Sequence, residues 1–216
     1  MSVLPKIGNK VSLTQRAYDT IKDAIIMNYF KPGDILSEER LADELAISRT
    51  PVRSALKMLS IEHLIVLNPS KNVVVSDISP KDVQEVTIVR SSLETTAVSL
   101  LASTISENQI IMLKSIVNKQ EKAVQNNDYQ LFIKFYYEFH VVIGELTNNK
   151  WLFEMIKNVN TIMQRYLILS GTLKQHSKKA ICEHYCIIDK LEKGDANAAE
   201  AKMREHLNNV NEQIFI

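Results

Sequence analysis

Two groups of side chains in this sequence are spaced so that they could do chemistry, and the first is a pair of arginines. Arg49 and Arg53 stand four residues apart in a segment, residues 45–61, whose only other charged residue is Lys57. Residues four apart share one face of a helix, so both guanidinium groups would point the same way. An arginine can bind O6 and N7 of guanine through two hydrogen bonds, or it can clamp a phosphate. An isolated pair would more often only solvate a helix surface, so the surrounding elements decide between these interpretations.

The second group consists of three histidines on the apolar stripes of three predicted helices. His140, His184 and His206 each have apolar residues three or four positions away, so all three should point inward. A buried imidazole needs a partner. Taken singly, each would be a core histidine that hydrogen-bonds to a neighbour. Together they could converge on a divalent transition metal such as zinc or nickel, since imidazole suits these ions.

A helix-turn-helix would position the two arginines. Apolar spacing predicts a helix over residues 14–28, and then Ser37 and Ser48 are placed to cap a second and a third helix. The helix-turn-helix would cover residues 37–57. Its second helix would enter the major groove of DNA, and the run from Ser48 to Arg53 is polar, rich in donors and free of acids, as that position requires.

Two β-rich runs after the third helix predict a hairpin wing. They cover residues 64–67 and 73–75, and a polar turn separates them. Lys71 at the tip of this hairpin could reach the adjacent minor groove, and Arg40 in the second helix could contact the DNA backbone or a base edge. The first domain would therefore be three helices and a wing, over residues 11–78, preceded by an N-terminal arm.

The remainder of the chain, residues 79–216, is predicted to be an all-α bundle. Ser79 and Pro80 restart helix in the favoured way, with a capping residue followed by proline at the first position. The aromatic-rich stretch 132–139 and Trp151 are expected to fill its core. The spacing predicts about six helices, over residues 80–103, 107–126, 128–147, 149–170, 174–193 and 195–213. The expected fold is thus mainly α, with an arm (1–10), a winged helix-turn-helix (11–78) and a helical bundle (79–216).

Composition excludes several classes of protein. The chain is 45% hydrophobic, which can fill real cores and excludes a disordered chain. It has no stretch of eighteen apolar residues and no apolar run at its start, so we expect a cytoplasmic protein that does not enter a membrane. The net charge is +1, which leaves the question of nucleic acid to the local positive segment. Cys182 and Cys186 lie one helical turn apart, where a disulfide would be strained, so we expect reduced thiols.

The run PGDILSEERLADELAISRTPVRSAL (Pro32–Leu56) resembles the GntR family of bacterial regulators, and the similarity extends from about Val11 to Ile78. The family usually has glycine at the tip of the wing, where this chain has Asn72. Asparagine tolerates a left-handed backbone but adds a side chain to the wing contacts. The resemblance implies that four residues make the main DNA contacts: Arg40, Arg49, Thr50 and Arg53.

The second half of the chain resembles the FCD domain, the helical ligand-binding bundle of the FadR subgroup. The resemblance is carried by Arg90–Glu94, Glu138–His140, Asn149, Glu183–His184 and His206–Leu207. It implies that three histidines hold a metal in some members, with an aspartate one turn before the first histidine. In this chain that position is Tyr136, and Glu138 points to the opposite side of the helix.

Loss of the aspartate predicts an altered metal site. Three histidines would be completed by water or by the carboxylate of an effector. The resemblance also implies that Arg90, Tyr136 and Asn149 line the effector site, because a guanidinium matches carboxylate geometry. For Arg90, an ion pair with Glu94 or Glu85 is the alternative.

The predicted function is ligand-controlled regulation of transcription, as a repressor of a metabolic operon. The partners would be a DNA operator with two-fold symmetry, a small carboxylate effector and a second copy of the chain. One alternative is a metal-dependent hydrolase or lyase that uses the histidine cluster, and another is a metal or metabolite carrier. A hydrolase needs a general base, and no carboxylate stands at helical spacing from the histidines. Both alternatives leave the first 78 residues without a purpose.

Overall fold

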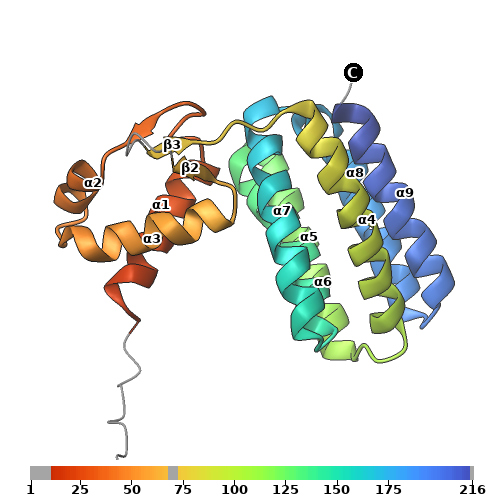
Figure 1. Cartoon of the computed structure of the whole chain (residues 1–216). Coiled ribbons are helices and arrows are strands. Elements are labelled where there is room, and N and C mark those ends of the chain that lie inside the picture. The colour runs from red at the N-terminus through yellow and green to blue at the C-terminus, as the bar shows by residue number, and fades with distance from the viewer. Residues whose placement is uncertain (1–10, 68–72, 215–216) are drawn as a thin grey trace, which may run out of the picture. The chain divides into compact units, whose positions relative to one another are not determined.

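The computed structural model describes residues 11–67 and 73–214 (Figure 1). These residues form two compact units, which divide between Asp77 and Ile78. The fold is mainly helical, with a small sheet in the first unit, as the sequence predicts. The predicted N-terminal arm lies outside the described residues, and so do the wing positions Lys71 and Asn72.

The described part of the first unit contains three helices: α1 (Leu13–Ile26), α2 (Glu38–Glu44) and α3 (Arg49–Ile61). The α1 helix ends two residues earlier than its apolar spacing predicts, and Asn28 then takes a left-handed backbone with φ of 61°. Ser37 caps α2, and its Oγ accepts a hydrogen bond from the backbone N of Arg40 at 3.4 Å. Ser48 stands at the N-cap of α3, but its side chain makes no capping hydrogen bond, contrary to the prediction.

Three short strands complete this unit: β1 (Ile35–Leu36), β2 (Ile65–Leu67) and β3 (Val73–Val75). They form one antiparallel sheet in the order β1-β3-β2, with Val74 of β3 opposite Ile35 on one side and Val66 on the other. The two wing strands agree with the predicted runs. The β1 strand was not predicted, because two residues are too few to show a period of two.

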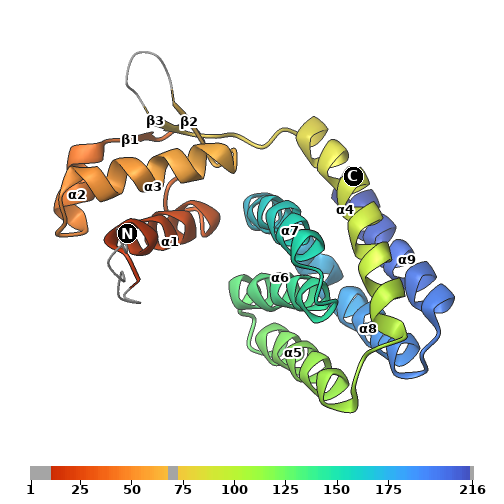
Figure 2. The same cartoon turned by 60° about the horizontal axis from the view of Figure 1, so that its bottom comes forward.

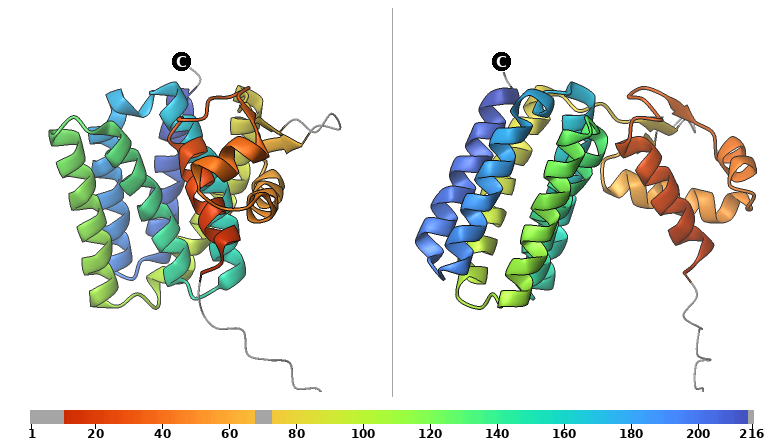
Figure 3. Two further views of the ribbon diagram at one scale, coloured as in Figure 1. Left: turned by 90° about the vertical axis from the view of Figure 1, so that its left-hand side faces the viewer. Right: turned by 180° about the vertical axis from the view of Figure 1, so that it is seen from behind.

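The second unit is a bundle of helices seen from several sides in Figure 2 and Figure 3. In the described residues they are α4 (Pro80–Ala102), α5 (Glu107–Gln125), α6 (Tyr129–Leu146), α7 (Lys150–Ser170), α8 (Leu173–Glu192) and α9 (Ala196–Ile214). Their ends lie within one or two residues of the predicted ones, because side-chain caps mark several starts. Ser79 and Asp82 form a reciprocal capping box at α4, and Ser106 and Gln109 form another at α5.

The bundle brings together helices that are far apart in the sequence. The α4 helix packs against α9, α7 and α6, and α8 packs against α5 and α9. Within residues 11–67 and 73–214, no helix has both the length and the apolar character needed to cross a bilayer.

Trp151 does not lie in the core, contrary to the prediction, because 70% of its surface is exposed. The α7 helix buries Leu152 and Ile156, which are four residues apart and share a face. Trp151 lies one residue earlier, on a different face of the helix. The Nζ atom of Lys150 lies 5.1 Å from the centroid of its indole ring.

Candidate nucleic-acid interface and buried histidine centre

The α3 helix separates an apolar face from a polar one. It buries Val52, Ala55, Leu56 and Leu59 against the core of the first unit. The predicted DNA-contacting residues of this helix and its cap stay exposed to solvent, and so does Arg40 on α2. These exposed residues are Arg40, Ser48, Arg49, Thr50 and Arg53.

Each of these arginines forms an ion pair with a glutamate of α2. Arg40 Nε lies 2.7 Å from Glu44 Oε1, Arg53 Nη2 lies 2.7 Å from Glu38 Oε2, and Arg49 pairs with Glu39 through a single Nη2 contact. These ion pairs were not predicted from the sequence. The signal was present, because Glu38 and Glu39 fall in the first turn of a helix that packs on α3.

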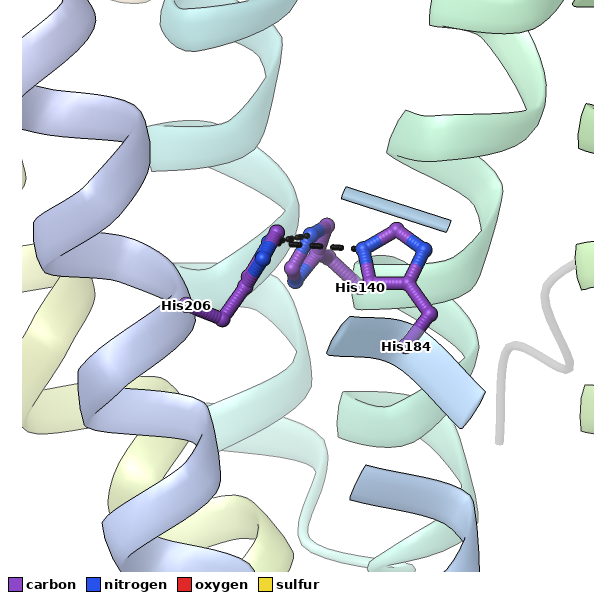
Figure 4. Close-up of side chains that lie close together, drawn as sticks. All are labelled: His140, His184 and His206. Atoms are coloured by element: carbon purple, nitrogen blue, oxygen red, sulfur yellow. Dashed lines mark hydrogen bonds between the residues drawn. The ribbon is translucent and has the colours of Figure 1, made fainter. Parts of the chain in front are cut away.

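The three histidines meet in the interior of the bundle, as Figure 4 shows. His140 comes from α6, His184 from α8 and His206 from α9, and none has measurable exposure to solvent. His206 Nε2 lies 3.3 Å from His184 Nε2 and 3.4 Å from His140 Nε2. One nitrogen from each ring therefore lies within 4.8 Å of the other two.

The opposite nitrogen, Nδ1, of each ring donates a hydrogen bond to an oxygen. The acceptors are Glu94 Oε2 for His140 at 2.5 Å, Gln120 Oε1 for His184 at 2.8 Å and Glu183 Oε2 for His206 at 2.7 Å. Gln120 Nε2 donates to the carbonyl of Phe135 at 3.0 Å, so its oxygen is the atom that faces the histidine. Because the Nδ1 proton is used in this way, each neutral ring presents its Nε2 lone pair to the common centre.

Tyr136 also faces this centre, from α6. Its hydroxyl donates to His206 Nε2 at 2.9 Å and accepts a hydrogen bond from Arg90 Nη2 at 3.4 Å. Arg90 Nε in turn donates to Glu94 Oε1 at 2.7 Å, and Asn160 Nδ2 donates to the same oxygen at 2.8 Å. Every helix of the bundle thus contributes at least one polar side chain to the site.

Burial keeps the three imidazoles neutral. It lowers the pKa of His140 to about 3, lowers the pKa of His184 well below its usual value, and lowers that of His206 as well. Burial alone would raise the pKa of Glu94, but the charge of Arg90 and the hydrogen bonds from His140 and Asn160 outweigh it and hold that pKa below its usual range. The Arg90–Glu94 pair is therefore charged while the histidines beside it are neutral.

Two of the three predicted effector residues lie at the histidine centre, and the third does not. Arg90 and Tyr136 lie at the centre. Asn149 is exposed and caps α7, since its Oδ1 accepts hydrogen bonds from the backbone N atoms of Trp151 and Leu152, both at 3.2 Å.

Four partners within the centre were not predicted from the sequence: Glu94, Gln120, Asn160 and Glu183. For Gln120 and Asn160 a signal existed, because each interrupts the buried stripe of its helix with an amide. For Glu94 and Glu183 the sequence offered no signal of which histidine each would contact, because the partner comes from another helix.

Two protein-family models match this chain, one in each of its two compact units. A family model for the FCD domain matches residues 85–209, and one for the gntR family of bacterial regulatory proteins matches residues 13–75. The uncharacterized HTH-type transcriptional regulator YdhC of Bacillus subtilis (strain 168) is 27% identical over 192 residues, covering 88% of this chain and 86% of that protein. The HTH-type transcriptional repressor RspR of Escherichia coli (strain K12) is 24% identical over 214 residues, covering 99% of this chain and 94% of that protein.

A solved structure has the same fold. E. coli McbR/YncC superposes with a TM-score of 0.85 at 22% identity, covering 95% of this chain and 98% of that one. The FCD model alone spans more than half of the chain. The chain therefore belongs to the gntR family of bacterial regulatory proteins with an FCD domain, and it is a DNA-binding transcriptional regulator with a ligand-binding C-terminal domain.

Proposed function

We propose that this regulator represses a metabolic operon, binding a two-fold symmetric duplex as a homodimer, and that a carboxylate effector binds at the histidine centre through a divalent metal. The observation that carries the metal proposal is the arrangement of three Nε2 lone pairs around one point. Among the described contacts, only the Tyr136 hydroxyl supplies a donor to them.

Three acceptor lone pairs that face one another are unfavourable without a cation between them. A proton is a poor candidate, because burial disfavours the charged imidazolium in each ring. A first-row divalent ion such as zinc or nickel fits the nitrogen donors, and the oxygen acceptors at Nδ1 are typical of histidines that bind metal. When bound, such an ion would supply a Lewis-acidic centre to which an anionic oxygen can bind.

Charge favours an anion as the effector. Arg90 and Glu94 neutralise each other, and Glu183 adds one negative charge at His206. Lys179 also pairs with Glu183, at 3.9 Å, so a divalent cation held by three neutral rings would leave at least one uncompensated positive charge, which a carboxylate can balance. The Tyr136 hydroxyl, released from His206 Nε2, is placed to donate a hydrogen bond to that carboxylate.

The same geometry weighs against a hydrolase or lyase, and we propose that the chain is not an enzyme. Among the residues that the structure describes, Glu94 and Glu183 are the carboxylates that contact the histidines, and each accepts a hydrogen bond from a histidine Nδ1. A general base must be free to take a proton from a substrate. These two carboxylates are already committed to orienting the rings.

For DNA, we propose that Arg40, Ser48, Arg49, Thr50 and Arg53 form the reading surface. All five are exposed on one helix-turn-helix, which is the arrangement that places α3 in a major groove. Two copies of the chain would place two such helices about one turn of DNA apart, and the doubled contact area supports specific binding. A homodimer would thus supply the DNA affinity that a single helix-turn-helix is too small to provide.

A salt-dependent shift assay tests the reading surface. Arg49→Ala and Arg53→Ala should each weaken duplex binding, and a lost phosphate contact lowers the salt slope by about one ion. Arg204→Ala on α9 is the matched control, because Arg204 is also exposed and paired with a glutamate, Glu200, at 2.9 Å. Parental binding by both reading-surface variants would rule this surface out.

A separate experiment tests the histidine centre. Protein stripped with a chelator is titrated with zinc or nickel, metal content is measured, and thermal shifts are then recorded across a set of carboxylic acids. His184→Ala should lose the metal response and the carboxylate response, while His176→Ala, a histidine outside the cluster, should keep both. Full metal content in His184→Ala would contradict the proposal that the histidine centre binds the metal.

A further inference from the structure

Glu38 holds the Arg53 guanidinium along one edge. Arg53 Nε lies 3.0 Å from Glu38 Oε1 and 2.9 Å from Oε2, and Arg53 Nη2 donates to Oε2 at 2.7 Å. The carboxylate therefore spans the edge formed by Nε and Nη2. Contacts at both ends of that edge set the plane of the guanidinium as well as its position.

The edge that Glu38 leaves open is the one that suits a base. A guanidinium has five N–H donors in a fixed fork, and Glu38 takes the Nε proton and one Nη2 proton. The terminal edge keeps one Nη1 and one Nη2 proton, side by side and parallel. Two parallel donors match O6 and N7 of guanine in the major groove.

Glu38 is itself well anchored. It is the first residue of α2, directly after the Ser37 cap, and α2 packs on α3 through the buried residues Leu41 and Ala42. The Glu38 side chain is 31% exposed, whereas that of Arg53 is 60% exposed. The hydrogen bond and charge of Arg53 also keep the pKa of Glu38 below its usual value. The less exposed carboxylate therefore acts as the support and the more exposed guanidinium as the reading group.

The pair formed by Glu39 and Arg49 is different. Arg49 reaches Glu39 through Nη2 alone, and both side chains are at least 60% exposed. Arg49 is held at this one nitrogen, so Glu39 does not set the plane of the guanidinium and instead competes with DNA for that nitrogen. The two neighbouring glutamates thus provide a test residue and a matched control.

We propose that Glu38 is a positioning residue for base recognition, which holds Arg53 so that its terminal edge bonds a guanine in the major groove. The proposal rests on the proposed role of Arg53 in the reading surface. Ordering a long side chain on binding costs free energy, and a guanidinium that is already oriented avoids part of that cost. Pairing also neutralises a carboxylate that would otherwise repel the phosphates.

The test begins with selection from a pool of randomised DNA duplexes by the full-length parent protein, which yields a preferred sequence. Anisotropy titrations then compare this duplex with duplexes in which single guanines are replaced. If replacing one guanine lowers the affinity of the parent protein but not that of Arg53→Ala, that guanine is the base that Arg53 binds. For the parent protein, replacing it should cost about 5- to 150-fold in affinity, as expected for a bidentate contact.

Glu38→Gln should reduce that preference by at least about fivefold, so that it approaches the preference of Arg53→Ala. About fivefold is the smallest loss expected when a bidentate contact to a base is removed. The double variant Glu38→Gln/Arg53→Ala should show no further loss, because Glu38 acts through Arg53. Glu39→Gln should keep the preference and bind all duplexes more tightly, since it removes a competing acid. Thermal melting of each variant checks that the first unit remains folded, and the preference ratio is insensitive to the folded fraction.

The outcomes separate this proposal from the proposed reading surface. If no sequence is enriched, or if Arg53→Ala keeps every base preference, the reading surface is wrong and the proposal falls with it. If Arg53→Ala loses a guanine preference that Glu38→Gln keeps in full, only the positioning role is overturned. A further loss in the double variant would also overturn it, because Glu38 would then act independently of Arg53.

Discussion

Glu94 of α4 and His140 of α6 are joined by a hydrogen bond of 2.5 Å between Oε2 and Nδ1, with both side chains fully buried. The other oxygen of the same carboxylate binds Arg90 and Asn160. One side chain therefore sets the tautomer of a proposed metal ligand and balances the charge of a buried arginine. We therefore expect the stability of the bundle and metal binding at the centre to be coupled through this residue.

Glu94→Gln should weaken both properties. A neutral amide accepts a weaker hydrogen bond from Nδ1 of His140 than a carboxylate does, so zinc affinity should fall by about 10- to 100-fold. Arg90 would lose its buried counter-charge, which should destabilise the fold by about 3–5 kcal/mol. Zinc titration and urea unfolding measure the two effects. Glu85→Gln, on the exposed side of α4, is the control, and equal zinc affinity in the two variants would contradict the role given to Glu94.

Substitutions of Tyr136 should separate metal binding from effector binding. Tyr136→Asp supplies a charged oxygen ligand and should tighten zinc binding by at least about tenfold, or ~1.4 kcal/mol. Tyr136→Phe removes the hydroxyl that donates to His206 Nε2, so zinc should bind somewhat more tightly while carboxylates bind more weakly. Metal titration followed by calorimetry with carboxylic acids distinguishes these responses. Weaker zinc binding in Tyr136→Phe would show that the phenol oxygen is itself a ligand.

Ala46→Gly should stabilise the first unit. Ala46 forms the turn between α2 and α3 with φ of 52°, a left-handed conformation that disfavours a residue with a Cβ. Glycine removes this strain but increases the entropy of the unfolded chain, so the net gain should be about 0.5–1 kcal/mol. Thermal unfolding of the full chain measures it. Ala42→Gly, in the buried face of α2, should instead destabilise the first unit. A loss of stability in Ala46→Gly would show that the backbone at Ala46 is not strained.

The metal-free protein should lose stability as the pH falls below about 6.5. In the unfolded chain the histidines take up protons near pH 6.5, whereas the pKa of His140 in the folded protein is about 3. The unfolded state therefore binds more protons between these values, and stability must decrease with decreasing pH throughout that window. Glu94, whose pKa is also lowered by folding, adds to the loss at the acidic end.

Melting temperatures recorded against pH in the presence of a chelator check this dependence. His140→Gln removes one of the depressed groups and should flatten the curve, and His176→Gln, a substitution outside the cluster, is the control. A melting temperature that is constant from pH 7 to pH 5 would mean that the histidines are not held neutral by burial.

Local features of the sequence were sufficient to predict most of the helices. Caps such as Ser37 and Ser79 favour one helix start over its neighbours, and apolar spacing shows which face is buried, so these features act within a few residues. The inward direction of His140, His184 and His206 followed from the same spacing. Trp151 shows the limit of this reasoning, because large aromatic residues favour burial only where a neighbouring helix covers their face.

The sequence by itself determined the helix-turn-helix with its wing strands, the six bundle helices and the three inward histidines, because each depends on short-range periodicity and capping. Only the tertiary structure decided which oxygen holds each Nδ1, that the three Nε2 atoms meet, that Asn149 serves as a cap, and that Glu38 grips Arg53. These relationships join residues of different elements. Their geometry depends on how helices cross and pack, which no local pattern encodes.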